Sequence, residues 1–191
     1  MMSSQQNDTI TRVGKGTPAG QLLRRYWQPV ALVEELPAER PVKAVRLMGQ
    51  DFVVFKDEQG RYGMLDRDCP HRGADLAAGR LEGGGLRCAF HGWLFDASGR
   101  CLSTPGEPVG STLCNKVRQS AYPIIEKAGV LFGYIGKDEP PAFPTSIASP
   151  RPMPTRSHSR DSSNATGYRR SKSVSIRRMR RFCIAFSKMR T

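Results

Sequence analysis

The alternation of apolar and polar side chains in the middle of the chain predicts β-strands, because neighbouring residues of a strand face opposite sides of a sheet. Short runs of this kind fall at residues 44–47, 52–55, 62–65, 93–96, 101–102, 124–125 and 130–135. Turn-forming residues separate them at 56–60, 97–100 and 127–129. Residues 41–136 are therefore predicted to be mostly antiparallel sheet, a meander followed by two hairpins.

A short helix is predicted ahead of the strands. Thr17 has a side chain suited to an N-cap and Pro18 suits the first helical position. Residues 21–27 continue the helix for about two turns before Pro29. We therefore expect an N-terminal extension over residues 1–25, followed by one all-β domain over residues 26–140.

The composition changes after residue 140. Residues 145–191 are rich in Ser, Arg and Pro, and they hold 12 of the 30 basic residues but one of the 17 acidic ones. Their charge is thus +11, which leaves +2 (18 minus 16) of the total of +13 for residues 1–144. A segment of this composition buries too little apolar surface to order itself. Residues 141–191 are predicted to be a basic, low-complexity, disordered tail.

The expected cellular compartment and the number of cysteines indicate what the cysteines do. No apolar run reaches transmembrane length, and the N-terminus lacks the basic-then-apolar order of a secretory signal. A cytoplasmic protein with no membrane partner is the expectation. The chain has five cysteines. In a reducing compartment, closely spaced cysteines are more often metal ligands than disulfide partners.

Two loop segments carry the most specific pattern in the chain. Cys69 and His71 form a Cys-x-His pair, and after sixteen further residues Cys88 and His91 form a Cys-x-x-His pair. A Rieske [2Fe-2S] centre uses two thiolates on one iron and two imidazoles on the other, which fits this alternating order. A structural zinc site is the alternative, but zinc fingers place both cysteines before both histidines. The pattern favours the [2Fe-2S] cluster.

Other candidates have simpler explanations. Cys101 and Cys114 are either extra ligands, redox thiols or, as we favour, buried packing residues. The Gly83-Gly84-Gly85 run lacks the helix and Lys-Ser/Thr of a phosphate-binding loop, so it is predicted to be a hairpin turn. Trp93 either shields a cluster from water or simply packs in the core.

Beyond these ligands, residues 9–144 carry strings that resemble the Rieske non-haem iron ring-hydroxylating oxygenases, in particular the oxygenase components of the phthalate dioxygenase-like subgroup. The strings are Thr11-Arg12-Val13-Gly14, Leu23-Arg24-Arg25-Tyr26-Trp27, Gly85-Leu86-Arg87-Cys88, His91-Gly92-Trp93 with Phe95-Asp96, and Ala121-Tyr122-Pro123. Respiratory Rieske proteins carry a further cysteine in each ligand loop, and this chain does not.

The resemblance implies an antiparallel β-sandwich with an inserted cluster-binding subdomain that accepts electrons from a flavin or iron–sulfur reductase. It also implies a homo-oligomer, a trimer in the family, in which electrons pass to a mononuclear Fe(II) in a second domain. This chain is too short for that domain, so we expect no catalytic residue in it. The alternative function is a stand-alone Rieske ferredoxin-type electron carrier.

A change of reading frame explains the tail better than a nucleic-acid-binding arm. If the frame shifts near Thr145, permitted synonymous codons give Trp across Thr166-Gly167 and His across Arg178-Met179 and Cys183-Ile184. These codons restore Asn-Trp-Leu-Gln-Ala and Asp-Pro-x-His strings of the missing domain, and they were chosen to do so. The remaining alternative is a tail that binds RNA or anionic lipid by charge.

Overall fold

The structure is a computed structural model that describes residues 2–144. The chain divides into two compact units, residues 1–149 and 150–191, and the described residues all belong to the first. The predicted tail lies outside the described residues from position 145 onward, and with it the reading-frame hypothesis. Within residues 2–144, no helix is long and apolar enough to cross a membrane.

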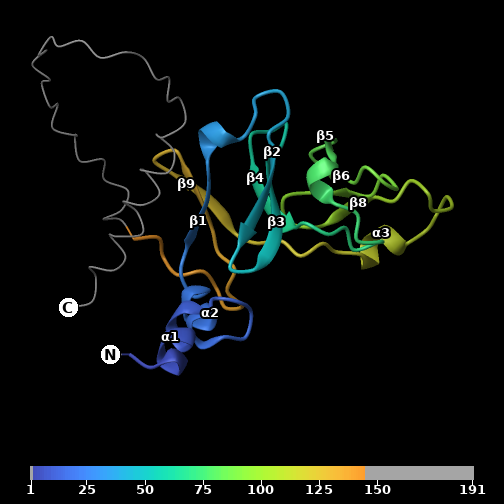
Figure 1. Cartoon of the computed structure of the whole chain (residues 1–191). Coiled ribbons are helices and arrows are strands. Elements are labelled where there is room, and N and C mark those ends of the chain that lie inside the picture. Colours follow the sequence, from blue (N-terminus) through green and yellow to red (C-terminus); the bar gives the residue numbers. More distant parts are fainter. Residues whose placement is uncertain (1, 145–191) are drawn as a thin grey trace, which may run out of the picture. The chain divides into compact units, whose positions relative to one another are not determined.

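The described residues form three antiparallel sheets, which confirms the all-β prediction (Figure 1). The first sheet has the order β1 (Gln28–Leu32), β10 (Val130–Gly133), β9 (Ile124–Lys127). The second has the order β2 (Val42–Leu47), β3 (Gln50–Lys56), β4 (Tyr62–Asp66). The third has the order β5 (Arg80–Glu82), β6 (Gly85–Arg87), β7 (Leu94–Phe95), β8 (Cys101–Ser103).

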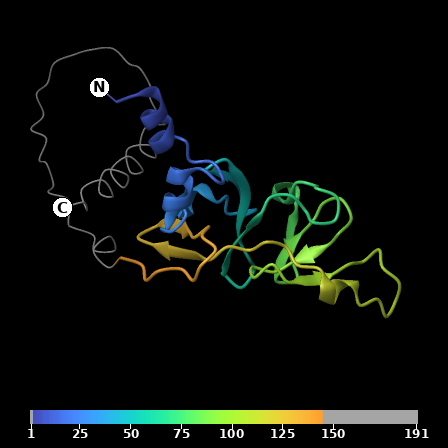
Figure 2. The ribbon, with the colours of Figure 1, turned by 90° about the horizontal axis from the view of Figure 1, so that it is seen from below.

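The second sheet lies between the other two, because its central strand is buried on both faces. Phe52 and Val54 of β3 pack in a core with residues of β1 and β10. Val53 and Phe55 face the opposite way and pack in a second core with residues of the third sheet. The view from below separates the three sheets in this order (Figure 2). The inserted subdomain is thus a four-stranded sheet whose core is shared with one face of the second sheet.

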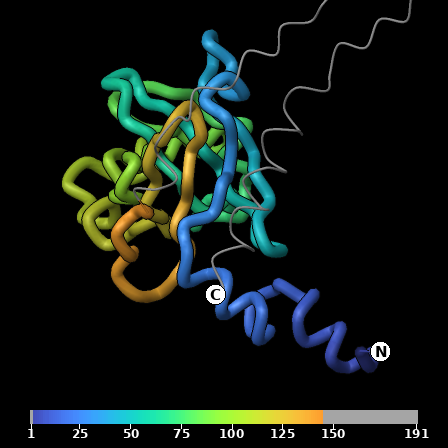
Figure 3. Tube along the Cα trace, turned by 90° about the vertical axis from the view of Figure 1, so that its left-hand side faces the viewer, coloured from blue at the N-terminus to red at the C-terminus, as the bar shows by residue number. Residues whose placement is uncertain are grey.

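The first sheet joins segments from the two ends of the described chain. Strand β1 pairs antiparallel with β10, with Leu32 opposite Val130, and the two run side by side in the tube view (Figure 3). Trp27, just before β1, donates its indole N–H to the carbonyl of Pro141 at 2.7 Å and packs against Tyr134 and Phe143. These contacts fix residues 134–143 to the start of the first strand.

The N-terminal helix begins where the sequence predicts but ends earlier. Helix α2 (Pro18–Leu23) is capped by Thr17, whose hydroxyl accepts from the Gly20 N–H. It stops four residues short of Trp27, because that side chain is buried against the sheet. A further helix, α1 (Ser4–Thr11), has a Ser3–Gln6 capping box and no buried residue. Such a helix shows no apolar period, so the sequence pattern missed it.

The remaining elements are short. Two 3₁₀ turns, η1 (Val33–Glu35) and η2 (Leu76–Ala78), and one helical turn, α3 (Leu113–Lys116), connect the strands. The predicted glycine turn is confirmed, since Gly83 and Gly84 adopt positive φ and join β5 to β6. Strands β5 and β6 themselves were not predicted, because three residues are too few to show a period.

Candidate metal centre

The two cysteine–histidine segments fold into the same turn. In loop 1 (residues 69–74) the Cys69 N–H donates to the Ala74 carbonyl at 2.8 Å, and the Gly73 N–H donates to the Cys69 carbonyl at 2.8 Å. In loop 2 (residues 88–93) Cys88 donates to Trp93 at 2.8 Å and Gly92 to Cys88 at 3.1 Å. Each loop therefore presents its cysteine at the first position and a glycine at the fifth.

Glycine is required at that fifth position by the backbone. Gly73 has φ of 66° and Gly92 has φ of 73°, in the left-handed region that side chains with a Cβ disfavour. The loops differ in where the histidine falls, third in loop 1 and fourth in loop 2. Sequence spacing alone hides this shared turn, since Cys-x-His and Cys-x-x-His look like different motifs.

The two thiols of the loops meet in the interior. Cys69 and Cys88 are each 3% exposed and belong to the same buried core, where Cys88 is close enough to act on the Cys69 thiol. Burial, more than the neighbouring Cys88, raises the pKa of the Cys69 thiol to about 11, while the main-chain N–H groups of His71 and Arg72 act in the opposite direction. Binding to a metal ion deprotonates such a thiol. The N–H groups then donate to thiolate sulfur.

The two imidazoles form a second pair. The rings of His71 and His91 lie edge to face with 4.5 Å between centroids. His71 Nδ1 is buried and has no hydrogen-bond partner among the described residues. The pKa of the His91 imidazole is lowered by desolvation, then by His71 and Arg72, which favours the neutral form. Neutral imidazole is the form that binds metal.

An aromatic ring packs against each imidazole of the pair. Trp93 of loop 2 stacks on His71 of loop 1, with centroids 4.4 Å apart and planes 10° from parallel. This contact joins the two loops directly, and Trp93 also belongs to the buried core. Phe90 packs against His91 with 3.9 Å between centroids but is 62% exposed. The imidazoles are therefore nearer to the surface than the thiols.

The donor set is two pairs, one of sulfur and one of nitrogen, and it fits a [2Fe-2S] cluster. A Rieske cluster takes two thiolates on one iron and two imidazoles on the other. Among residues 2–144, no group of three or more His, Cys, Asp and Glu surrounds a single ion position. The buried, unpaired His71 Nδ1 is an atom for which coordination supplies the missing partner.

Residues outside the motifs hold the loops, and sequence reasoning missed them. Gln119, 6% exposed, donates both amide hydrogens to main-chain carbonyls before loop 1, to Asp66 at 2.7 Å and Asp68 at 2.8 Å. Tyr122 donates to the Asp66 carboxylate at 3.0 Å, and burial raises the pKa of this phenol to about 12. Nothing in the local sequence signals these long-range contacts.

Ion pairs brace the outer side of each loop. Arg67 and Asp75 form a two-point pair across the ends of loop 1, with nitrogen–oxygen distances of 2.9 and 2.5 Å. Arg87 pairs with Glu82 beside loop 2 and also donates to the Gly92 carbonyl. Each arginine therefore sits one or two residues before its ligand cysteine and fixes the chain on both sides of the turn.

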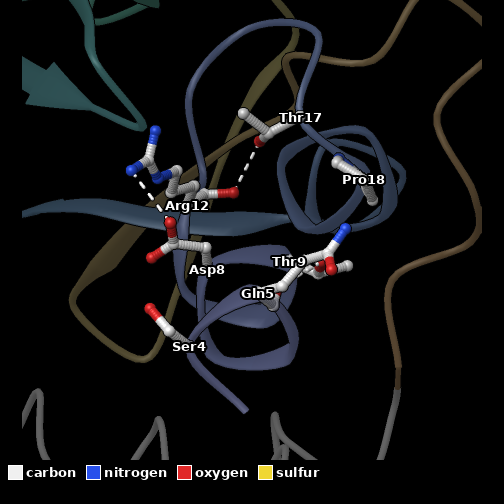
Figure 4. Close-up of a pocket in the computed structure, with 7 residues that line it drawn as sticks. All are labelled: Ser4, Gln5, Asp8, Thr9, Arg12, Thr17 and Pro18. Carbon is white, nitrogen blue, oxygen red and sulfur yellow. Dashed lines mark hydrogen bonds and ion pairs between the residues drawn. The ribbon is translucent and has the colours of Figure 1, made fainter.

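The remaining candidates lie apart from the two pairs. Cys101 is buried in the same core as Cys69, and Cys114 packs at its edge, as expected for packing residues. A surface groove between α1 and α2 is lined by the residues drawn in Figure 4, where Arg12 pairs with Asp8 at 3.0 Å and accepts from Thr17 through its carbonyl. That groove includes neither cysteine–histidine loop.

The comparisons with known proteins agree with this chemistry. The family described as "Rieske [2Fe-2S] domain" matches residues 26–119. The chain is 47% identical over 147 residues to the 5,5'-dehydrodivanillate O-demethylase oxygenase subunit of Sphingobium sp., covering 75% of this chain and 34% of that protein. It is 43% identical over 146 residues to the phthalate 4,5-dioxygenase oxygenase subunit of Pseudomonas putida, covering 75% and 33%.

Solved structures share the fold. The complex between oxygenase and ferredoxin in carbazole 1,9a-dioxygenase matches with a TM-score of 0.55 and 26% identity, covering 62% of this chain and 30% of that one. The chain spans about a third of the length of the curated relatives it matches.

Proposed function

This chain belongs to the Rieske [2Fe-2S] domain family, with oxygenase subunits among its relatives, and on that basis we propose that it is an electron-transfer domain of such an oxygenase. Cys69 and Cys88 are the proposed thiolate ligands. His71 and His91 are the proposed imidazole ligands. When bound, a Rieske [2Fe-2S] cluster supplies one-electron transfer.

The observation that carries this proposal is the buried His71 Nδ1 without a partner, beside the paired Cys69 and Cys88 thiols. A buried polar atom without a partner costs about 1–3 kcal/mol. The core excludes water from the sulfur side, where Cys69 and Cys88 are each 3% exposed, while Phe90 beside His91 is 62% exposed and leaves the imidazole side close to solvent. This asymmetry favours electron entry and exit through the histidines.

Metal and sulfide analysis of the purified, reconstituted chain tests the ligand assignment. We expect two irons and two acid-labile sulfides per chain, with nitrogen couplings from two histidines in the electron paramagnetic resonance of the reduced form. Cys88→Ser and His91→Ala should each abolish the signal. Cys114→Ser and Cys183→Ser remove cysteines outside the proposed set and should keep it. One zinc per chain without sulfide would contradict the proposal and support the structural-zinc alternative.

The oxygenase role of the whole protein is a further part of the proposal. Both an O-demethylase and a dioxygenase subunit are related to this chain. We therefore assign electron delivery to these residues and leave the choice between demethylation and ring hydroxylation to a mononuclear-iron domain. Rapid reduction of the cluster by a flavin or iron–sulfur reductase is expected. Stoichiometric product from the purified chain with reductase, oxygen and a phthalate-like substrate would contradict this division of labour.

The alternative of a stand-alone ferredoxin has less support. Ahead of β1, α1 and α2 lie outside the part that matches the Rieske family. Arg24 anchors this segment by donating to the carbonyls of Val13 at 3.0 Å and Met48 at 3.2 Å. An N-terminal extension that is folded into helices and held to the domain by Arg24 favours an oxygenase subunit over a ferredoxin. We also propose that the chain forms a homo-oligomer, a trimer as expected of the family. Sedimentation equilibrium measures this oligomeric state.

A further inference from the structure

The fold brings together two cysteines that have no place in the proposed cluster. Cys101 lies in β8 and Cys114 in α3, and the segment between them is exposed from residue 105 to residue 112. Cys114 donates its thiol to the Cys101 carbonyl at 3.1 Å, which places its sulfur beside the main chain of Cys101. Packing alone does not require two thiols to meet.

Their burial differs in a way that suits stepwise chemistry. Cys101 is 3% exposed, while Cys114 is partly exposed beside a solvent-facing loop. A partly exposed thiol meets an external oxidant first, and a buried neighbour in contact with it closes the bond. Helix α3 packs on β8, so the two chain segments are already adjacent. The closed ring would span residues 101–114.

We propose that Cys101 and Cys114 form a reversible dithiol–disulfide pair, a second redox site beside the cluster. With oxidised glutathione as oxidant, the Cys114 thiolate attacks the glutathione disulfide, one glutathione thiolate leaves, and a mixed disulfide forms. The Cys101 sulfur then attacks Cys114, and the second glutathione leaves. Two cysteine thiols lose two electrons and two protons, and one glutathione disulfide becomes two thiols.

The closed ring contacts loop 2, which couples this pair to the candidate metal centre. A Cβ built on Gly92 would lie 2.9 Å from Cγ of Pro105, a residue of the ring. Strand β8 also pairs with β7, which follows Trp93 directly. Closing the ring therefore constrains the segment that packs on the turn after His91. This role is independent of the proposed oxygenase function, since it needs no reductase or substrate.

The experiment uses the full chain with its cluster, carrying Cys183→Ser to remove the tail thiol. The protein is equilibrated anaerobically with glutathione buffers of increasing disulfide content, quenched in acid, alkylated after unfolding and digested with trypsin. Trypsin cuts after Arg100 and Lys116, so both cysteines fall on one peptide, whereas Cys69 and Cys88 fall on two others. We expect this peptide to lose both alkyl groups and become lighter by two hydrogen atoms, reversibly with dithiothreitol.

Two variants of Cys114 and the electron paramagnetic resonance of the cluster show whether the disulfide forms and whether it affects the metal centre. Cys114→Ser and Cys114→Ala should each leave Cys101 fully alkylated at every buffer composition while the iron content stays unchanged. In the parent, ring closure should shift the resonance of the reduced cluster, and neither variant should show that shift. A peptide that keeps both alkyl groups, stops at the mixed disulfide, or pairs with Cys69 or Cys88 would overturn the proposal.

Discussion

Loop 1 and loop 2 share one turn but are supported in different ways. Both close with the same two main-chain hydrogen bonds and a left-handed glycine. Loop 1 is held from a distance, by Gln119 bonding to the carbonyls that precede it. Loop 2 is held from nearby, by Arg87 and by Trp93 within its own hairpin. The turn is thus a local product of sequence, while the meeting of the two pairs depends on tertiary contacts.

The largest expected difference between the loops comes from Gln119→Leu. This change removes both hydrogen bonds from the Gln119 amide to the carbonyls of Asp66 and Asp68. It should lower the free energy of unfolding by about 3 kcal/mol, or about 1.5 kcal/mol for each bond. Urea denaturation measures the loss. Hydrogen exchange should rise in loop 1 before loop 2, because only loop 1 depends on this contact.

Gln21→Leu is the control for that variant, since Gln21 is exposed on α2 and should change stability by less than about 0.5 kcal/mol. Equal exchange rates in the two loops of the Gln119 variant would show that its effect is global. In that case loop 1 would not depend on Gln119 more than loop 2 does.

A pair of alanine substitutions compares the glycines at the same position of the two turns. Gly73→Ala meets open space, so it should cost about 1 kcal/mol, the penalty of a Cβ at positive φ. Gly92→Ala adds a contact at 2.9 Å with Pro105 and should cost about 2 kcal/mol. Thermal unfolding measures both. A larger loss for Gly73 would contradict the closer packing of loop 2.

The sequence allowed the middle sheet and the four candidate ligands to be predicted because both are local signals. Alternation marks β3, and cysteine–histidine spacing marks each loop within a few residues. Strand β1 was missed because its partner, β10, is supplied from the other end of the domain. Gln119 was missed for the same reason, since a buried glutamine has no pattern until its two acceptors are known. The contact between Cys101 and Cys114 also needed the fold.

The smallest effect is expected from the ion pairs that brace the loops. Asp75→Asn keeps an acceptor for the Ala77 N–H but removes the charge facing Arg67, and both partners are more than a third exposed. Solvent screening limits the loss to about 0.5–1 kcal/mol at neutral pH. Glu82→Gln is the matched change at loop 2, where Arg87 keeps its bond to Gly92.

The pH dependence of Asp75→Asn decides whether charge is responsible. Arg67 holds the pKa of Asp75 below its ordinary value. A depressed carboxyl pKa stabilises the fold above the unfolded value, about 3.9, and that contribution is lost as pH falls through the folded value. The difference in the free energy of unfolding between parent and Asp75→Asn, measured by urea denaturation, should therefore be constant between about pH 6 and about pH 7. It should shrink below about pH 4. A difference that persists unchanged in acid would show that the charge of Asp75, and hence its pair with Arg67, is not what supports loop 1.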